Sequence, residues 1–395
     1  MAYLDHAATT PLRPEAAEAM AKAAMDAGNA SSLHASGRRA RRVVEESREA
    51  IAQVVGCRPG DVIFTSGGTE ADNLAVKGLH GSRRAAAEDR RRIFASGVEH
   101  HAVMDPLVWL EETGQADIAW LPVDQLGRVS AELVAAELAA DPDSVSLVTV
   151  MWANNEVGTT QPISAIAAVA AEYGIPMHSD AVQAVGSVPV DFAESGVTSM
   201  AVSAHKLGGP VGVGALVLDR KADVVAQLHG GGQERGVRSG TLNVAGIAGF
   251  AAALVAVAAE QESEVARLSG LRAELVQRVI EAVPDAQYNG DPEPAGRLPG
   301  NAHFSFPGCE GDALLLLLDA RGVECSTGSA CSAGLAQPSH VLIAMGMDEP
   351  GARSSLRFTL GHTSSAADID ALLTALPGAV ERARVAPRLR RATSS

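Results

Sequence analysis

The chain has 395 residues, of which 47% are hydrophobic and 20% charged, and it carries a formal net charge of −15. This length and composition indicate a globular protein of two or three domains and argue against nucleic acid as a direct ligand, because phosphate backbones are bound by an excess of Lys and Arg. Since no apolar run approaches the ~20 residues that cross a bilayer and the N-terminus lacks the features of a signal peptide, we expect a cytoplasmic protein with no membrane contact.

Strand and helix patterns alternate over the first two-thirds of the chain. A proline start and a glycine stop predict a helix over 14–28, and apolar residues at helical spacing predict another over 38–55. This alternation predicts an α/β fold with a mostly parallel sheet and helices on both faces. Strands are expected at 61–65, 92–96, 117–121, 145–151, 175–179, 199–203 and 213–218, and helices at 69–78, 101–113, 130–140 and 162–173.

The pattern changes after residue 241, where a long alanine-rich helix is expected over 242–283 and could break near 269–270. We therefore predict a large domain over 15–260 and a smaller α+β domain formed by 1–14 and 261–395. The elements expected in the smaller domain are a Pro/Gly-rich segment at 289–300, strands at 303–306 and 354–360, and helices at 311–321 and 365–383.

Lysine is rare in this chain, so each candidate for amine chemistry can be inspected. Lys22, Lys77 and Lys221 lie on helix surfaces or in a turn, where solvation explains them. Lys206 directly follows the strand at 199–203, and ligand crevices of α/β sheets open at strand carboxyl ends. Lys206 is therefore a candidate Schiff-base former, with a surface lysine in a loop as the alternative.

Two further features complete a possible cofactor site. The segment 65–70, TSGGTE, joins a strand to a helix start, and its glycines and hydroxyls suit a phosphate, although it is neither a Walker loop nor a dinucleotide fingerprint. Asp180 ends another strand and could pair with a pyridine nitrogen, or it could simply be a loop aspartate. Together with Lys206, these features match the aldehyde, ring nitrogen and phosphate of pyridoxal phosphate.

The four cysteines are too few for a disulfide framework in a chain of this length. Cys331 lies among small residues in STGSACSAG, and an exposed thiol there is a plausible nucleophile. Cys325 is interpreted as a packing residue, although redox coupling to Cys331 stays open. Cys57 follows a glycine that ends a helix and Cys309 lies in a turn, and both are interpreted as structural.

The sequence resembles the cysteine desulfurases, pyridoxal-phosphate enzymes of the fold-type I aminotransferase superfamily. The stretch from Cys331 to Arg357 resembles the housekeeping, longer-loop branch, and Ala30 stands where the family usually has proline. The resemblance covers nearly the whole chain through the motifs YLDHAATTP, GNASSLH, FTSGGTEADN, VEHHAV, NNEVG, HSDAVQAVG, SAHKLGGP, HGGGQERGVRSGT, STGSACSAG and SSLRFTLG.

The resemblance implies a role for each site residue. Lys206 would bond the cofactor aldehyde, while Asp180 and Gln183 would hold its ring nitrogen and ring hydroxyl. His100 would stack on the ring and assist proton transfer, whereas its neighbour His101 is expected to face solvent at a helix start. The phosphate would be held by Gly68, Thr69, Ser203 and His205, and by Thr241 reaching across the interface of a homodimer.

The implied reaction converts L-cysteine to L-alanine. Asn155, which would also contact the cofactor, and Arg357 would hold the substrate carboxylate, and Cys331 would receive the sulfur as a persulfide. The sulfur would pass to an acceptor protein, either an iron–sulfur cluster scaffold or a tRNA-thiolation enzyme. No intrinsic metal is expected, although Cys331 could transiently contact a cluster on a scaffold.

Two rival functions remain. An aminotransferase or selenocysteine lyase would need no persulfide, and Cys331 in its segment of small residues speaks against it. A catalytically silent scaffold that only binds sulfur-transfer partners would need no chemistry, and the presence of Lys206, Asp180 and Cys331 speaks against that.

Overall fold

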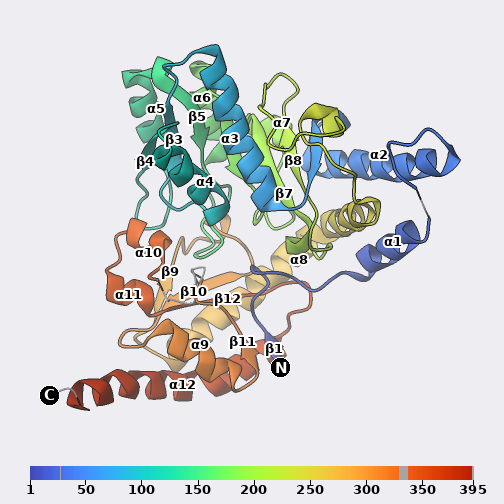
Figure 1. The fold of residues 1–395 in the computed structure, drawn as a ribbon. Coiled ribbons are helices and arrows are strands. Elements are labelled where there is room, and N and C mark those ends of the chain that lie inside the picture. Colours follow the sequence, from blue (N-terminus) through green and yellow to red (C-terminus); the bar gives the residue numbers. More distant parts are fainter. Residues whose placement is uncertain (27, 329–336, 394–395) are drawn as a thin grey trace.

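The computed structural model describes residues 1–26, 28–328 and 337–393, with side chains up to residue 385. Its larger part is built on a seven-stranded sheet in the order β2-β8-β7-β6-β5-β3-β4 (Figure 1). All neighbouring strands are parallel except β8, which runs antiparallel to both β2 and β7, so the predicted mostly parallel α/β fold is confirmed. The strands are β2 (Val62–Thr65), β3 (Arg92–Ser96), β4 (Asp117–Leu121), β5 (Val145–Thr149), β6 (Met177–Asp180), β7 (Ser199–Ser203) and β8 (Gly214–Leu218).

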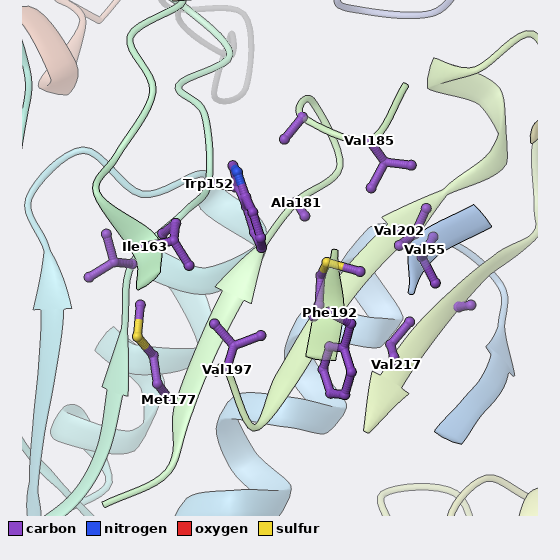
Figure 2. Packing of buried hydrophobic residues seen from close by; sticks show 14 of the residues in the cluster. Val55, Trp152, Ile163, Met177, Ala181, Val185, Phe192, Val197, Val202 and Val217 are labelled. Carbon is purple, nitrogen blue, oxygen red and sulfur yellow. The ribbon is translucent and has the colours of Figure 1, made fainter. Parts of the chain in front are cut away.

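Helices cover both faces of this sheet because the strands are apolar on both sides. One face packs against α3 (Gly68–Ala86) and α4 (His101–Glu112). The other face forms the cluster of Figure 2, in which Val202 and Val217 of the sheet pack with Phe192 and Val55. That face is covered by α2 (Ala35–Val55), α5 (Ala131–Ala140), α6 (Ile163–Glu172), the short α7 (Phe192–Ser195) and the first half of α8 (Val244–Ala282).

The smaller part, drawn at the bottom of Figure 1, has its own hydrophobic cluster. An antiparallel sheet in the order β12-β10-β9 packs against α9 and α12, and the N-terminal strand β1 pairs in parallel with β11. Its elements are β1 (Ala2–Tyr3), β9 (Gln287–Asn289), β10 (Asn301–Ser305), α9 (Gly311–Asp319), β11 (Val323–Glu324), α10 (His340–Ala344), α11 (Glu349–Arg353), β12 (Ser355–Thr359) and α12 (Ala366–Thr393).

The long helix α8 connects the two parts without interruption. The possible break near 269–270 does not occur, because an isolated glycine costs a helix only about 1 kcal/mol and does not by itself end it. Four buried α8 residues between Ile247 and Leu254 belong to the first cluster, whereas Leu275 and Val279 belong to the second. The domain boundary at residue 260 stays a prediction.

By length and composition alone, α8 could cross a membrane, contrary to the expectation from the sequence. In the structure it packs instead against α1 (Pro14–Ala24) and α2. One part of this helix packs in the first hydrophobic cluster and another part in the second.

Some helix ends differ from those predicted. The helix after β2 continues to Ala86 instead of stopping at Gly78. A Cβ on Gly78 would lie 2.3 Å from Cγ1 of Val224, so this glycine lets the helix pack closely against the segment after β8. The last helix likewise continues to Thr393, beyond the predicted end at residue 383.

Candidate functional site

A cavity of about 400 Å³ lies at the carboxyl ends of β6 and β7, where they face residues of the smaller part. Parallel strands direct their carboxyl ends to one edge of the sheet, which brings distant segments together at this point. The predicted site residues that line it are Gly68, Thr69, His100, Asn155, Asp180, Gln183, Ser203, His205, Lys206 and Arg357.

Lys206 ends a single 3-10 turn that directly follows β7. Its Nζ donates hydrogen bonds to the carbonyl oxygens of Ala7 at 2.5 Å and Ala8 at 2.8 Å. Burial, with the nearby positive charge of Arg357, lowers the pKa of this amine to about 8. A buried amine that loses its proton near neutral pH can react with an aldehyde or act as a base.

Asp180 is the last residue of β6, and its Oδ1 accepts a hydrogen bond from the backbone N–H of Val182 at 2.9 Å. Burial raises the pKa of this carboxyl, while His100 and Lys206 partly oppose the shift. A buried carboxyl group of this kind is stabilised as a carboxylate when a cation lies against it. A protonated ring nitrogen would meet that need.

His100 caps the start of α4 through its ring. Its Nδ1 accepts the backbone N–H of Ala102 at 3.1 Å, so the neutral ring carries its proton on Nε2. Burial lowers the pKa of His100, which favours this neutral form. The ring can therefore present an Nε2–H donor beside the cavity.

A cradle suited to phosphate lies at the start of α3. A Cβ on Gly68 would lie 2.8 Å from Cγ2 of Val182, so glycine allows the backbone to come this close. The first N–H groups of a helix lack intrahelical acceptors and lie at the positive end of its dipole. The Oγ of Ser203 is buried and has no hydrogen-bond partner among the described residues, and Thr69 adds a second hydroxyl.

His205 lies beside this cradle. Its Nδ1 is 3.3 Å from Oγ1 of Thr9, and its carbonyl oxygen accepts the backbone N–H of Thr10. Burial and the neighbouring Lys206 lower the pKa of His205 to about 4, so its ring is neutral at physiological pH. It can contribute a hydrogen bond to a phosphate but no charge.

The guanidinium of Arg357 already has two protein acceptors. Its Nη1 donates to the carbonyl oxygen of Asn155 and its Nη2 to Oδ1 of Asp5, both at 2.8 Å. Its Nε is buried without a hydrogen-bond partner in the described part of the chain. The arginine is thus held at the cavity by the N-terminal segment and by the loop after β5.

One predicted site residue among the described residues is not brought to this cavity. Thr241 is exposed and is not part of the lining. Cys331 lies outside the described residues, although Ser326 and Gly328, which precede it, line the cavity. Cys325 packs in the second hydrophobic cluster, and burial raises the pKa of its thiol to about 12.

Several lining residues were not predicted from the sequence. Asp72 lies one helical turn after Thr69, and its Oδ1 is 3.1 Å from Nε2 of the fully buried His178. His101 begins α4 and is partly exposed, and it also lines the cavity. Spacing of three or four residues on a helix could have indicated Asp72. The unpredicted lining residues are Ala7, Ala8, Asp72, His101, Ala102, Met151, Glu156, Val182, Ser326, Gly328 and His340.

Comparisons with known proteins agree over nearly the full length. Residues 2–372 match the family model described as aminotransferase class-V. An IscS-like cysteine desulfurase from Mycobacterium tuberculosis is 59% identical over 384 residues, which cover 97% of either chain. Among solved structures, a NifS-like protein superposes with a TM-score of 0.88 at 31% identity, covering 96% of this chain and all of the other. A structure described as SspA in complex with cysteine gives a TM-score of 0.78 at 31% identity, over 91% of this chain and 99% of the other.

Proposed function

Because the chain belongs to the cysteine desulfurases of the class-V aminotransferase family, we propose that its cavity removes the sulfur from L-cysteine and leaves L-alanine. The observation that carries this proposal is the convergence of Lys206, Asp180 and Ser326, the last only five residues before Cys331, on one cavity. The solved relative described as bound to cysteine supports the choice of substrate.

Enzymes of this family depend on pyridoxal phosphate, and the residues present fit that cofactor. Lys206 would bond its aldehyde, Asp180 would pair with its ring nitrogen and Gln183 would meet its ring hydroxyl. The unpartnered Oγ of Ser203 and the close backbone at Gly68 leave a place for its phosphate. Thr69 and His205 would complete that phosphate site, and His100 would lie against the ring.

When bound, pyridoxal phosphate supplies an aldehyde for covalent attachment of amines and a ring that withdraws electrons from the substrate Cα. The residues of the chain do the rest. Nζ of Lys206 takes the proton from Cα, for which its lowered pKa suits it. Arg357 and Asn155 hold the substrate carboxylate, with Arg357 oriented by its bond to Asp5.

We propose that sulfur leaves the substrate by attack of the Cys331 thiolate. A bond forms between the sulfur of Cys331 and the substrate sulfur, and the bond between that sulfur and the substrate Cβ breaks. The electron pair of the broken bond remains on the carbon skeleton, which takes up protons from Lys206 or His100 and leaves as alanine. Cys331 is left as a persulfide, whose outer sulfur is passed to an acceptor protein.

The wider context of the enzyme is proposed on the family relationship. We expect a homodimer in which Thr241 of each subunit contacts the phosphate of the other site, which accords with its exposure and its absence from its own cavity. We expect the sulfur acceptor to be a cluster scaffold or a tRNA-thiolation enzyme, in the cytoplasm.

The test is Cys331→Ser compared with Cys325→Ser. Cys331→Ser should keep the absorption band of the bound cofactor, because Lys206 and Asp180 are unchanged. For a lysine-bound, protonated cofactor this band lies at about 410–420 nm. It should lose nearly all alanine production, since a hydroxyl is a far weaker nucleophile than a partly ionised thiol. Cys325→Ser should change turnover little.

Mass spectrometry provides the direct observation. After exposure of the wild-type enzyme to L-cysteine without reductant, the peptide containing Cys331 should gain one sulfur, about 32 Da. Normal turnover by Cys331→Ser, or extra sulfur only on Cys57 or Cys309, would overturn the proposed mechanism. Normal turnover would also favour a lyase or transaminase that needs no protein thiol.

A further inference from the structure

The segment from Leu228 to Thr241 is exposed at its end, and it is bonded at two points to elements of its own chain next to the cofactor cradle. Thr241 does not line that cavity. The segment is tied to strand β2, which ends at Thr65, and to helix α3, whose first turn carries the cradle residues Gly68 and Thr69. The contacts at these two points suggest a role for the segment beyond connecting β8 to α8.

The first point is an ion pair between Arg238 and Glu70. Arg238 donates from Nε to Oε1 of Glu70 at 2.6 Å and from Nη2 to Oε2 at 3.1 Å. The same Oε2 accepts the backbone N–H of Ser66 at 2.7 Å. Although burial alone would raise it, these bonds from Arg238 and Ser66 hold the pKa of Glu70 below its usual value. One carboxylate therefore joins the turn before α3 to the segment that ends at Thr241.

The second point is a buried carboxylate of the segment itself. Glu234 accepts two hydrogen bonds from Arg48, at 2.8 and 2.9 Å, and a third from the backbone N–H of Phe64 in β2 at 2.8 Å. Glu234 and Arg235 have φ values of 46° and 59°, in a region that residues other than glycine rarely adopt. Backbone in this region persists where surrounding contacts determine it, as the three bonds to Glu234 do here.

The segment is also bonded to itself on either side of these points. The backbone N–H of Gly240 donates to Oε1 of Gln233 at 2.9 Å, and that of Gly232 donates to Oγ of Ser239 at 3.3 Å. Ser239 is buried. Ser239 and Gly240, which connect Arg238 to Thr241, are thus bonded to the residues just before Glu234.

We infer that Glu70 and Arg238 are positioning residues. Within each subunit they couple the phosphate cradle to the Thr241 of the same subunit, which reaches into the site of the partner subunit. This inference rests on the proposed function, because it assumes that Thr241 crosses a dimer interface. A phosphate bound in one cradle fixes the turn at Ser66 and the first turn of α3. Glu70 and Arg238 then hold Thr241 in the position that the other site requires, so cofactor binding at the two sites is coupled in both directions.

A heterodimer separates this role from simple support of the local fold. One chain, the donor, carries Lys206→Ala, so that only the other, intact chain can bond the cofactor through its lysine. Absorbance of the lysine-bound cofactor then reports the intact site alone. We expect Glu70→Gln in the donor chain to raise the Kd of pyridoxal phosphate at the intact site about tenfold, the size expected for loss of one charge-assisted contact. Glutamine keeps an acceptor for Ser66 but loses the ion pair.

A control variant and a second variant of the ion pair accompany this measurement. Glu274→Gln in the donor removes an ion pair with Arg278 on α8, remote in the sequence from both tie points, and should leave the Kd unchanged. Arg238→Lys in the donor keeps the charge but loses the paired geometry, and it should give an intermediate increase. Dimer content is measured by sedimentation in every case, so that a loss of assembly is recognised.

The outcomes discriminate between the inference and its premise. If Glu70→Gln affects the Kd only when it is placed in the intact chain, the pair supports its own cradle and the coupling is wrong. If Thr241→Ala in the donor also leaves the intact site unchanged, the shared site of the proposed function fails, and the coupling fails with it. If Thr241→Ala weakens the intact site while Glu70→Gln in the donor does not, the shared site stands and only the inference is overturned.

Discussion

Arg357 and Asp5 are joined by a 2.8 Å hydrogen bond, although 352 residues separate them in the sequence. The bond forms because β12 and the N-terminal segment lie side by side, with an isolated bridge between Asp5 and Thr359. The Arg357 side chain is almost completely buried at the cavity, and this hydrogen bond orients its guanidinium. Asp5 is thus a positioning group for the arginine that we assign to the substrate carboxylate.

Asp5→Asn should therefore weaken substrate binding more than it slows turnover. The amide can still accept one hydrogen bond, but it no longer neutralises or fixes the guanidinium. We expect the KM for L-cysteine to rise about tenfold, within the range for a charge-assisted hydrogen bond. Steady-state kinetics measure this, with Asp370→Asn as the control, since Asp370 pairs with Arg278 at an exposed site. An unchanged KM would show that Arg357 keeps its orientation without Asp5.

Cofactor loading should depend on pH through the amine of Lys206. Only the neutral amine attacks an aldehyde, and burial lowers the pKa of this amine to about 8. The rate at which the apoenzyme bonds pyridoxal phosphate should therefore rise with pH and level off above about pH 8. Stopped-flow absorbance measures the rate. A rate that continues to rise toward the ordinary lysine pKa near 10.5 would contradict the assignment.

Gly68→Ala should lower cofactor affinity through sterics alone. The added Cβ would lie 2.8 Å from Cγ2 of Val182, so the start of α3 or the Val182 side chain must shift. We expect the Kd of pyridoxal phosphate to rise about tenfold or more, because a displaced helix start misaligns its phosphate-binding N–H groups. Fluorescence titration of the apoenzyme measures the Kd. If affinity is unchanged, the start of α3 does not hold the phosphate.

Gly270→Ala on α8 should stabilise the protein, whereas Gly68→Ala introduces a steric clash. A Cβ there would meet no atom within 4 Å, and the residue lies inside a continuous helix. We expect the free energy of unfolding to increase by about 0.5–1 kcal/mol, because alanine is the better helix former. Urea denaturation of the apoenzyme measures this. A decrease would indicate that the helix bends at this residue.

Glu99 should make the protein less stable as pH rises. Its side chain is fully buried, with Oε1 accepting the backbone N–H of Met151 at 2.6 Å and Oε2 unpartnered among the described residues. Burial raises its pKa from 4.5 to about 8, so between these values the folded state holds more protons than the unfolded state. The stability that the neutral carboxyl provides is therefore present below pH 4.5 and is lost as pH rises toward 8.

Glu99→Gln should remove this pH dependence, since the amide keeps an acceptor for Met151 and never ionises. Relative to the wild type, the variant should gain unfolding free energy between pH 6 and pH 9, by an amount of about 1–3 kcal/mol. Urea denaturation of the apoenzyme at the two pH values measures the difference. A constant difference between the two proteins would mean that Glu99 does not titrate in this range.

Much of the fold could be predicted because its signals are local. Strands at 92–96, 117–121 and 199–203 have the predicted bounds, since short apolar runs between turn residues are a local pattern. Helix ends were predicted less well, as at Gly78, where the glycine serves packing against Val224 and does not end the helix. A contact with a residue that lies far along the chain leaves no such local pattern.

The chemistry of the site was determined by the sequence, and its geometry by the tertiary structure. Lys206, Asp180 and Gly68 could be named in advance because each belongs to a local sequence pattern. These patterns are a lysine after a strand, an aspartate at a strand end and glycines before a helix. The buried pair of Asp72 and His178, the bond from Asp5 to Arg357 and the ties that hold the segment before Thr241 could not. They depend on which surfaces of separate elements come into contact, and the pKa shifts depend on the burial that this contact produces.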